Sequence, residues 1–159
     1  MVKDIRAGLP RLPLVGEAKR GPEGHLTYLL RQANASVRLA LDRALAKEDM
    51  THPQQSVLTM IRAYEAISAA DVARLTMLTP QTINGIVRAL EMRGAIRKEP
   101  DRVHGRILRL MVTDEGRELN KRCRTLTAPI EAALQARMTA GTEDAIRQWL
   151  VDVAKAFLE

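Results

Sequence analysis

The chain has 159 residues, of which 46% are hydrophobic and 28% are charged, so it can bury a core and general disorder is excluded. Its net charge of +6 favours an anionic partner, while aromatic residues at only 3%, scattered along the chain, disfavour a stacking platform for single-stranded nucleic acid. One cysteine excludes an intrachain disulfide, no apolar run reaches the ~20 residues of a membrane span, and no secretory signal is expected.

Residues 1–22 are predicted to form an arm that contains prolines and glycines, which exclude a regular helix. The apolar residues of this arm need cover, so it lies against the body or a partner subunit; the alternative is a solvated tail. A long amphipathic helix is predicted over 24–47, where apolar residues recur at spacings of three and four. A second helix is predicted to begin at Thr51, with Pro53 in its first turn.

A short helix and a tight turn are predicted next. Ser68 and Asp71 have the spacing of a capping box, with Asp in place of the usual Glu. This helix should reach about Thr76, and the turn follows at 77–78.

The helix after this turn has the most informative pattern. Thr79 is a good N-cap, Pro80 suits the first helical position, and Gly94 suits the end. Apolar residues with helical spacing should face the core, namely Ile83, Ile86, Val87 and Leu90. The residues left facing outward are Gln81, Thr82, Asn84, Gly85 and Arg88.

Those outward residues are of types that recognise base edges in duplex DNA. Gln or Asn can form two hydrogen bonds to adenine, and Arg can do so to guanine. The alternative for each residue is an ordinary solvated helix face. Gly85 costs ~1 kcal/mol relative to alanine inside a helix. Either a close approach of DNA offsets this cost, or the glycine has no role.

A basic hairpin is predicted at 95–99 and 106–112, joined by a turn that contains Gly105. Leu108, Leu110 and Val112 alternate as in a half-buried strand. Residues 79–113 contain seven basic and three acidic residues (7 − 3 = +4), whereas 114–159 contain seven and eight (7 − 8 = −1). The excess charge therefore lies on the recognition helix and the hairpin.

Two more helices are predicted in the remainder of the chain. Thr113 should cap the first, and the second should follow a break at 141–142. The second presents apolar residues along one face, namely Ile146, Trp149, Leu150, Val153 and Phe157.

From about residue 28 to 119 the chain resembles the multiple-antibiotic-resistance regulator (MarR) family of bacterial winged helix-turn-helix repressors. The resemblance is carried by residues 51–55 (THPQQ), 79–80 (TP), 90–94 (LEMRG) and 112–116 (VTDEG), the last similar to the family's Leu-Thr-x-x-Gly. It implies a mainly α fold with a small β-hairpin wing. Residues 51–113 would form the DNA-binding domain, and 24–47 with 114–159 a helical dimerisation region.

The resemblance also implies a homodimer in the bacterial cytoplasm that binds double-stranded DNA at a near-palindromic operator. The recognition helices would enter successive major grooves, and the wings would enter the minor groove. Thr79 and the outward residues of its helix would contact DNA, together with Arg102, His104 and Arg106 of the wing. For Arg106 the alternative is a solvated arginine at a hairpin tip. The apolar face of the last helix agrees with a dimer, because a monomer would expose it.

Control by a small aromatic or phenolic effector is a further implication. Four residues are expected to bound its cleft: His25, Tyr28, His52 and Tyr64. The alternative is that they are ordinary rim or core residues. The chain departs from the family twice: His104-Gly105-Arg106 replaces the usual Asp-x-Arg of the wing, and Met77 replaces a common glycine of the turn.

No cofactor, metal site or catalytic residue is predicted. The three histidines and Cys123 lack metal-ligand spacing, and Cys123 lies in an apolar stripe, where burial should raise its pKa. Phosphate-binding loops and nucleophile elbows are missing from the sequence. A winged-helix protein-interaction module without DNA binding is the alternative function. The charge of the recognition segment argues against that alternative.

Overall fold

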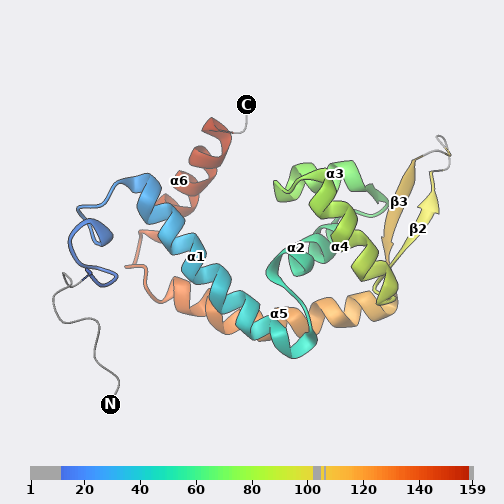
Figure 1. Ribbon diagram of the computed structural model, residues 1–159, viewed down its shortest axis with the longest axis horizontal. Coiled ribbons are helices and arrows are strands. Elements are labelled where there is room, and N and C mark those ends of the chain that lie inside the picture. The colour runs from blue at the N-terminus through green and yellow to red at the C-terminus, as the bar shows by residue number, and fades with distance from the viewer. Residues whose placement is uncertain (1–11, 102–104, 106, 158–159) are drawn as a thin grey trace, which may run out of the picture. The chain divides into compact units, whose positions relative to one another are not determined.

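The computed structural model describes residues 12–101, 105 and 107–157, and the chain forms two compact units, Met1–Arg38 and Leu39–Glu159. In the first unit, a 3₁₀ turn at Ala18–Arg20 (η1) precedes helix α1 at Leu26–Leu45, whose last residues belong to the second unit (Figure 1). The Arg20 side chain donates to Gln32 Oε1 at 3.1 Å and to the Pro13 carbonyl at 3.0 Å. The described part of the N-terminal arm is therefore tied to α1.

The second unit contains a three-stranded antiparallel sheet among helices. In chain order its elements are η2 Ala46–Glu48, α2 His52–Ala63, β1 Ile67–Ser68, α3 Ala69–Thr76, α4 Pro80–Met92, β2 Ile96–Pro100, β3 Leu108–Val112, α5 Asp114–Gln135 and α6 Glu143–Ala156. The strand order is β1-β3-β2. The mainly α fold with a hairpin wing is confirmed. Strand β1, which pairs Ile67 with Leu110, was not predicted.

Hydroxyl caps begin helices α2, α3, α4 and α5 where the sequence placed them, whereas the Thr142 side chain before α6 makes no capping hydrogen bond. Each cap hydroxyl accepts a hydrogen bond from the backbone N–H three residues later, and the pairs are Thr51–Gln54, Ser68–Asp71, Thr79–Thr82 and Thr113–Gly116. Each such cap contributes about 1 kcal/mol. The Ser68 hydroxyl also donates to the Asp71 carboxylate, and this bond holds the pKa of Asp71 below its usual value, with Arg74 adding to the effect.

One hydrophobic core joins α2, α3, α4, the sheet and the first half of α5. Cys123 is fully buried in it, and desolvation raises the pKa of its thiol, as the sequence predicted. Leu108 differs from the prediction, because its side chain is 48% exposed. It pairs with Pro100 at the outer end of the hairpin, which extends beyond the helices (Figure 1).

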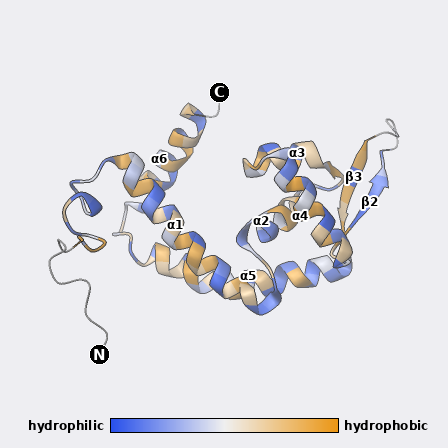
Figure 2. Ribbon diagram, in the orientation of Figure 1, coloured by the Kyte–Doolittle hydropathy of each residue, from blue (hydrophilic) through white to orange (hydrophobic). Residues whose placement is uncertain are grey.

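The C-terminal helices α5 and α6 contain many apolar residues (Figure 2), and several of these side chains are exposed. In α5 the stripe is buried at Leu119 and Cys123 but only partly buried from Leu126 onward, and α6 buries none of its residues. Trp149 is 42% exposed, and Phe157 lies just after the helix rather than within it. No helix in the described part of the chain is long and apolar enough to cross a membrane.

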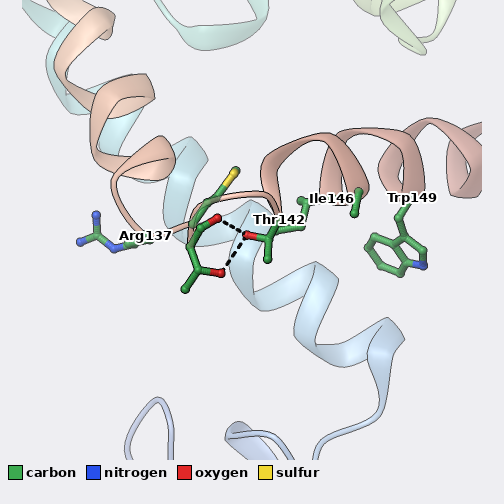
Figure 3. A pocket seen from close by; sticks show the side chains of 7 residues that line it. Arg137, Thr142, Ile146 and Trp149 are labelled. Atoms are coloured by element: carbon green, nitrogen blue, oxygen red, sulfur yellow. Dashed lines mark hydrogen bonds between the residues drawn. The ribbon is translucent and has the colours of Figure 1, made fainter.

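An apolar hollow of about 430 Å³ lies beside the turn that connects α5 to α6 (Figure 3). Thr142 closes the turn, since its hydroxyl donates to the Thr139 carbonyl at 2.7 Å. The hollow is lined by Arg137, Met138, Thr139, Thr142, Ala145, Ile146 and Trp149. Its apolar lining is part of the uncovered surface of the terminal helices.

Candidate nucleic-acid interface

Helix α4 is fixed to the core by one face and exposes the other. Its four predicted core residues, Ile83, Ile86, Val87 and Leu90, are all buried. All five residues predicted to face outward, Gln81, Thr82, Asn84, Gly85 and Arg88, are exposed. The helix therefore presents a polar surface on a rigid support, which is the arrangement that groove recognition needs.

The N-terminal end of α4 is electrostatically suited to phosphate. Thr79 Oγ1 accepts from the Thr82 backbone N–H at 3.2 Å and lies 2.8 Å from the Thr82 hydroxyl. The first turn contains no acidic residue. A helix N-terminus carries partial positive charge, and here no carboxylate opposes it.

In the turn before α4, Met77 adopts the left-handed backbone conformation that glycine would favour. Met77 has φ 54° and ψ 32°, and its backbone N–H donates to carbonyls of the last turn of α3. This conformation costs a non-glycine residue about 1–2 kcal/mol. The Met77 side chain is 67% exposed, so it makes little packing in return. The departure from the usual glycine thus leaves the turn intact but strained.

Gly85 is not required by packing within the chain. A Cβ built at this position would meet no atom within 4 Å. An alanine would therefore fit in the free protein. Any reason for glycine here must come from a bound partner.

Ion pairs within the segment 79–113 leave its net charge of +4 unchanged, because its acidic residues are already subtracted in that count. Its three acidic residues are all paired, in Lys98–Glu91 at 2.6 Å, Arg97–Glu99 at 2.7 Å and Arg109–Asp101 at 2.5 Å. Arg93 lies 3.9 Å from Glu48, outside the segment. Among the described residues of the segment, Arg88 is the basic residue that forms no ion pair. Among the described residues of 79–113, the positive charge without an acidic partner therefore lies at Arg88 and not along the whole segment.

The hairpin stays paired up to its tip. The β2–β3 register runs from Ile96–Val112 to Pro100–Leu108, and the Asp101 N–H donates to the Ile107 carbonyl at 2.8 Å. Arg102, His104 and Arg106 lie outside the described residues, so their proposed DNA contacts, and the effect of His104 in place of an aspartate, stay predictions. Gly105 is exposed.

The four residues predicted to bound an effector cleft divide between the two units, and their role stays a prediction. His52 begins α2 and Tyr64 follows its end, so they are about 18 Å apart along a 12-residue helix. His25 and Tyr28 belong to the first unit, where the Tyr28 hydroxyl donates to Gln32 at 3.3 Å. In the second unit, His52 Nε2 lies 3.4 Å from the Ser56 hydroxyl.

Two hollows of the winged-helix unit were not found from the sequence. One, of about 530 Å³, is lined by Tyr64, Glu65, Ala66, Ile67, Asp71, Arg74, Leu75 and Arg109. The other, of about 440 Å³, lies between α3 and α4 and is lined by Ala69, Ala70, Ala73, Arg74, Leu78, Pro80 and Asn84. The run of small residues at the start of α3 is the only sequence signal that points to the second hollow.

Comparison with known proteins agrees with this geometry. Residues 50–108 match the MarR family model. The HTH-type transcriptional repressor Rv2887 of Mycobacterium tuberculosis is 32% identical over 125 residues, which cover 79% of this chain and 90% of that protein. Its structure in complex with salicylic acid has a TM-score of 0.66 at 30% identity, over 83% of this chain and 98% of the other.

A second structure supports the fold alone. The transcriptional repressor CouR, bound to a 23-mer DNA duplex, has a TM-score of 0.78 at 24% identity and covers 87% of this chain and 98% of its own. A further structure, CouR from Rhodococcus jostii RHA1 bound to p-coumaroyl-CoA, has a TM-score of 0.71 at 25% identity over 85% of this chain and 92% of the other.

Proposed function

The chain belongs to the MarR family of transcriptional regulators, and from that membership we propose that it is a homodimeric repressor that binds a near-palindromic duplex and releases it on binding a small aromatic or phenolic ligand. The observation that carries the proposal is the exposed polar face of α4, with Arg88 free of ion pairs among the described residues. Residues 51–113 would contact DNA, and 24–47 with 114–159 would form the dimer.

The exposed face of α4 has the right length for a short stretch of bases. From Gln81 to Arg88 the helix rises about 10 Å, the length of roughly three base pairs. Gln81 and Asn84 carry the amides that pair with adenine, and Arg88 carries the guanidinium that pairs with guanine. Thr79 and Thr82 at the helix start would contact phosphate.

The dimer is supported by the surface that a single chain leaves uncovered. Trp149 and Leu150 of α6 are exposed, together with the partly buried second half of the α5 stripe. A second copy would bury these side chains and remove apolar surface from water. A twofold dimer requires half-sites about one helical turn apart, ~34 Å, or a multiple of that distance.

The effector class is proposed from Rv2887, which has been solved with salicylic acid and with p-aminosalicylic acid. In this chain, the hollow lined by Tyr64 combines a phenol ring with the guanidinium groups of Arg74 and Arg109. An aromatic carboxylate that binds there would have to displace Asp71 from Arg74 or Asp101 from Arg109. Calorimetry with aromatic carboxylates, phenols and acyl-thioesters tests the proposal, and no heat from any of them would argue for a ligand-independent regulator.

DNA binding is tested by selecting duplexes from a random pool with the full chain. Affinity for the selected duplex, measured by fluorescence anisotropy, should fall steeply with salt because bound counterions are released. Arg88→Gln should weaken this affinity about tenfold, the value of one good base contact. Arg124→Gln is the matched control, since Arg124 is exposed on α5 and is not among the residues proposed to contact DNA. Failure to select any duplex would favour the protein-interaction alternative.

A further inference from the structure

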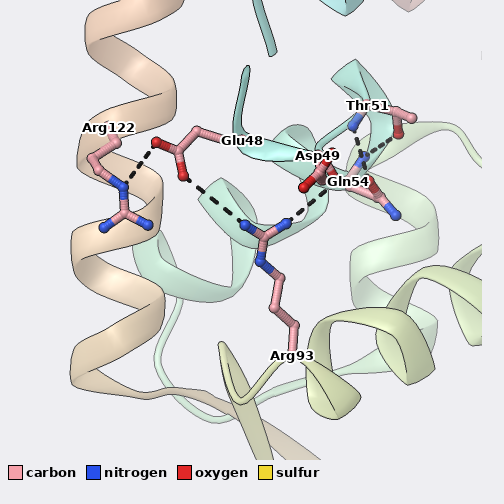
Figure 4. A network of polar contacts seen from close by, with 6 residues as sticks. All are labelled: Glu48, Asp49, Thr51, Gln54, Arg93 and Arg122. Atoms are coloured by element: carbon pink, nitrogen blue, oxygen red, sulfur yellow. Dashed lines mark hydrogen bonds and ion pairs between the residues drawn. The ribbon is translucent and has the colours of Figure 1, made fainter. Parts of the chain in front are cut away.

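A carboxylate bridge joins the end of α4 to two other elements of the second unit (Figure 4). Glu48 Oε1 accepts from Arg122 Nε of α5 at 3.0 Å, and Glu48 Oε2 lies 3.9 Å from Arg93 Nη2. Arg93 Nη1 also donates to the Asp49 carbonyl at 3.3 Å. One acidic side chain, only 20% exposed, thus lies between two arginines from distant parts of the chain.

The backbone around Glu48 is held in a fixed conformation. Glu48 ends η2, and the next residue, Asp49, is left-handed with φ 48°. Its neighbours Leu45 and Met50 are buried in the core. The corner therefore cannot follow small movements of Arg93, and it acts as a fixed point.

The end of α4 is also wound tightly at Arg93. Gly94 is left-handed with φ 73°, and the Ala95 N–H donates to the Leu90 carbonyl at 2.9 Å. The Thr113 hydroxyl donates to the Gly94 carbonyl at 2.7 Å. Because this turn is rigid, a force on the Arg93 side chain is transmitted to the axis of α4 rather than absorbed by a flexible loop.

The charges show why Glu48 is the central group. The hydrogen bond from Arg122 and the nearby charge of Arg93 lower the pKa of Glu48, so the carboxylate stays ionised. Arg93 follows the last helical residue of α4, where the negative end of the helix dipole stabilises a cation. Without Glu48, the two arginines would lose the acid that they share.

Because α4 is long, a small tilt about its C-terminal end at Arg93 produces a large displacement at its N-terminal end. The 13 residues of α4 span about 20 Å. A tilt of ~10° about the Arg93 end would displace Gln81 by roughly 3 Å over that length. A displacement of this size breaks a hydrogen bond, whose donor and acceptor lie about 2.7–3.2 Å apart.

We propose that Glu48 is a positioning residue for DNA recognition: through Arg93 it fixes the tilt of α4 against the α1–α2 corner and α5. The inference rests on the proposed DNA-binding function. Glu48 itself would not contact DNA, and neither would Arg93, whose guanidinium is engaged by Glu48 and the Asp49 carbonyl.

The test compares Glu48→Gln, which keeps the shape and removes the charge, with Glu131→Gln. Glu131 is exposed on α5 and only weakly paired, with Arg147 at 3.9 Å. Affinity for the selected duplex should fall about tenfold in Glu48→Gln, while affinity for an unselected duplex stays the same. A general loss of folding would lower both affinities together. Equal selectivity in Glu48→Gln and the wild type overturns the proposal.

A double-mutant cycle separates action through Arg93 from other routes. Arg93→Gln should lose selectivity like Glu48→Gln, and the double variant should be no worse than Arg93→Gln alone. Losses that add would overturn the proposed route.

Hydrogen exchange of the DNA-free protein tests the bridge independently of DNA. Amides of residues 89–95 should exchange several-fold faster in Glu48→Gln and at the wild-type rate in Glu131→Gln. Unchanged exchange in Glu48→Gln overturns the bridge. If the wild type selects no duplex but the exchange result holds, the proposed function fails while the restraint on α4 stands.

Discussion

Helices α4 and α6 are both amphipathic, but the apolar face of α4 is buried whereas that of α6 is largely exposed. Helix α4 buries Ile83, Ile86, Val87 and Leu90 in the core and exposes Gln81, Thr82, Asn84, Gly85 and Arg88 on its other side, although Met92 at its end is also exposed. Helix α6 buries none of its residues and leaves Ile146, Trp149 and Leu150 exposed. The comparison shows that the two helices expose faces of opposite polarity.

The two exposed faces differ in the free energy of their exposure to water. The polar face of α4 is stable in water, so it stays available for a polar, charged ligand such as DNA. The apolar face of α6 costs free energy in water at about 25 cal/mol per Å². A protein surface of matching polarity, supplied by a second copy of the chain, would remove that cost.

Shortening a buried leucine of α4 should have the largest effect on stability. Leu90→Ala should lower the free energy of unfolding by about 2–5 kcal/mol, because a cavity replaces a fully buried side chain. Leu150→Ala in α6 is the matched variant, and it should cost far less at protein concentrations where the chain is monomeric. Urea unfolding measures both. Equal losses would mean that the two helices do not differ as described.

Placing a charge on the apolar face of α6 should break the proposed dimer. Leu150→Glu should raise the dimer dissociation constant about 100-fold, roughly 3 kcal/mol, because the new carboxylate would be buried without a partner. Gln148→Glu adds the same charge on an exposed position of the helix and should leave the dimer intact. Analytical ultracentrifugation gives the dissociation constants, and a Leu150→Glu chain that dimerises normally would argue against this interface.

Replacing Gly85 tests whether the polar face of α4 meets DNA closely. Gly85→Ala should raise the free energy of unfolding by about 1 kcal/mol, since alanine is the better helix former and its Cβ meets nothing. If DNA approaches the backbone here, the same variant should bind the selected duplex more weakly. A gain in stability with full DNA affinity would remove the functional role of this glycine.

The smallest effect is expected at the strained turn before α4. Met77→Gly should stabilise the fold by about 0.5 kcal/mol, because relief of the left-handed conformation slightly exceeds the entropy cost of glycine. Thermal unfolding measures the shift, and Leu75→Gly, in the helical conformation of α3, should instead be destabilising. A destabilised Met77→Gly variant would show that the Met77 side chain has packing value.

Local patterns decided a large part of this protein. Caps such as Thr79, which act within three residues, set where the helices begin, and spacing alone predicted which face of α4 is exposed. A hydroxyl that satisfies a backbone N–H and a stripe that must avoid water act the same way in most tertiary settings.

Only the tertiary structure decided the rest. Strand β1 has two residues and exists because β3 supplies its hydrogen bonds, and the bridge from Glu48 to Arg93 and Arg122 spans 44 or more positions. Charge counts could not show that Arg97, Lys98 and Arg109 are paired. These features depend on distances between segments, and a linear sequence does not specify such distances until the chain is packed.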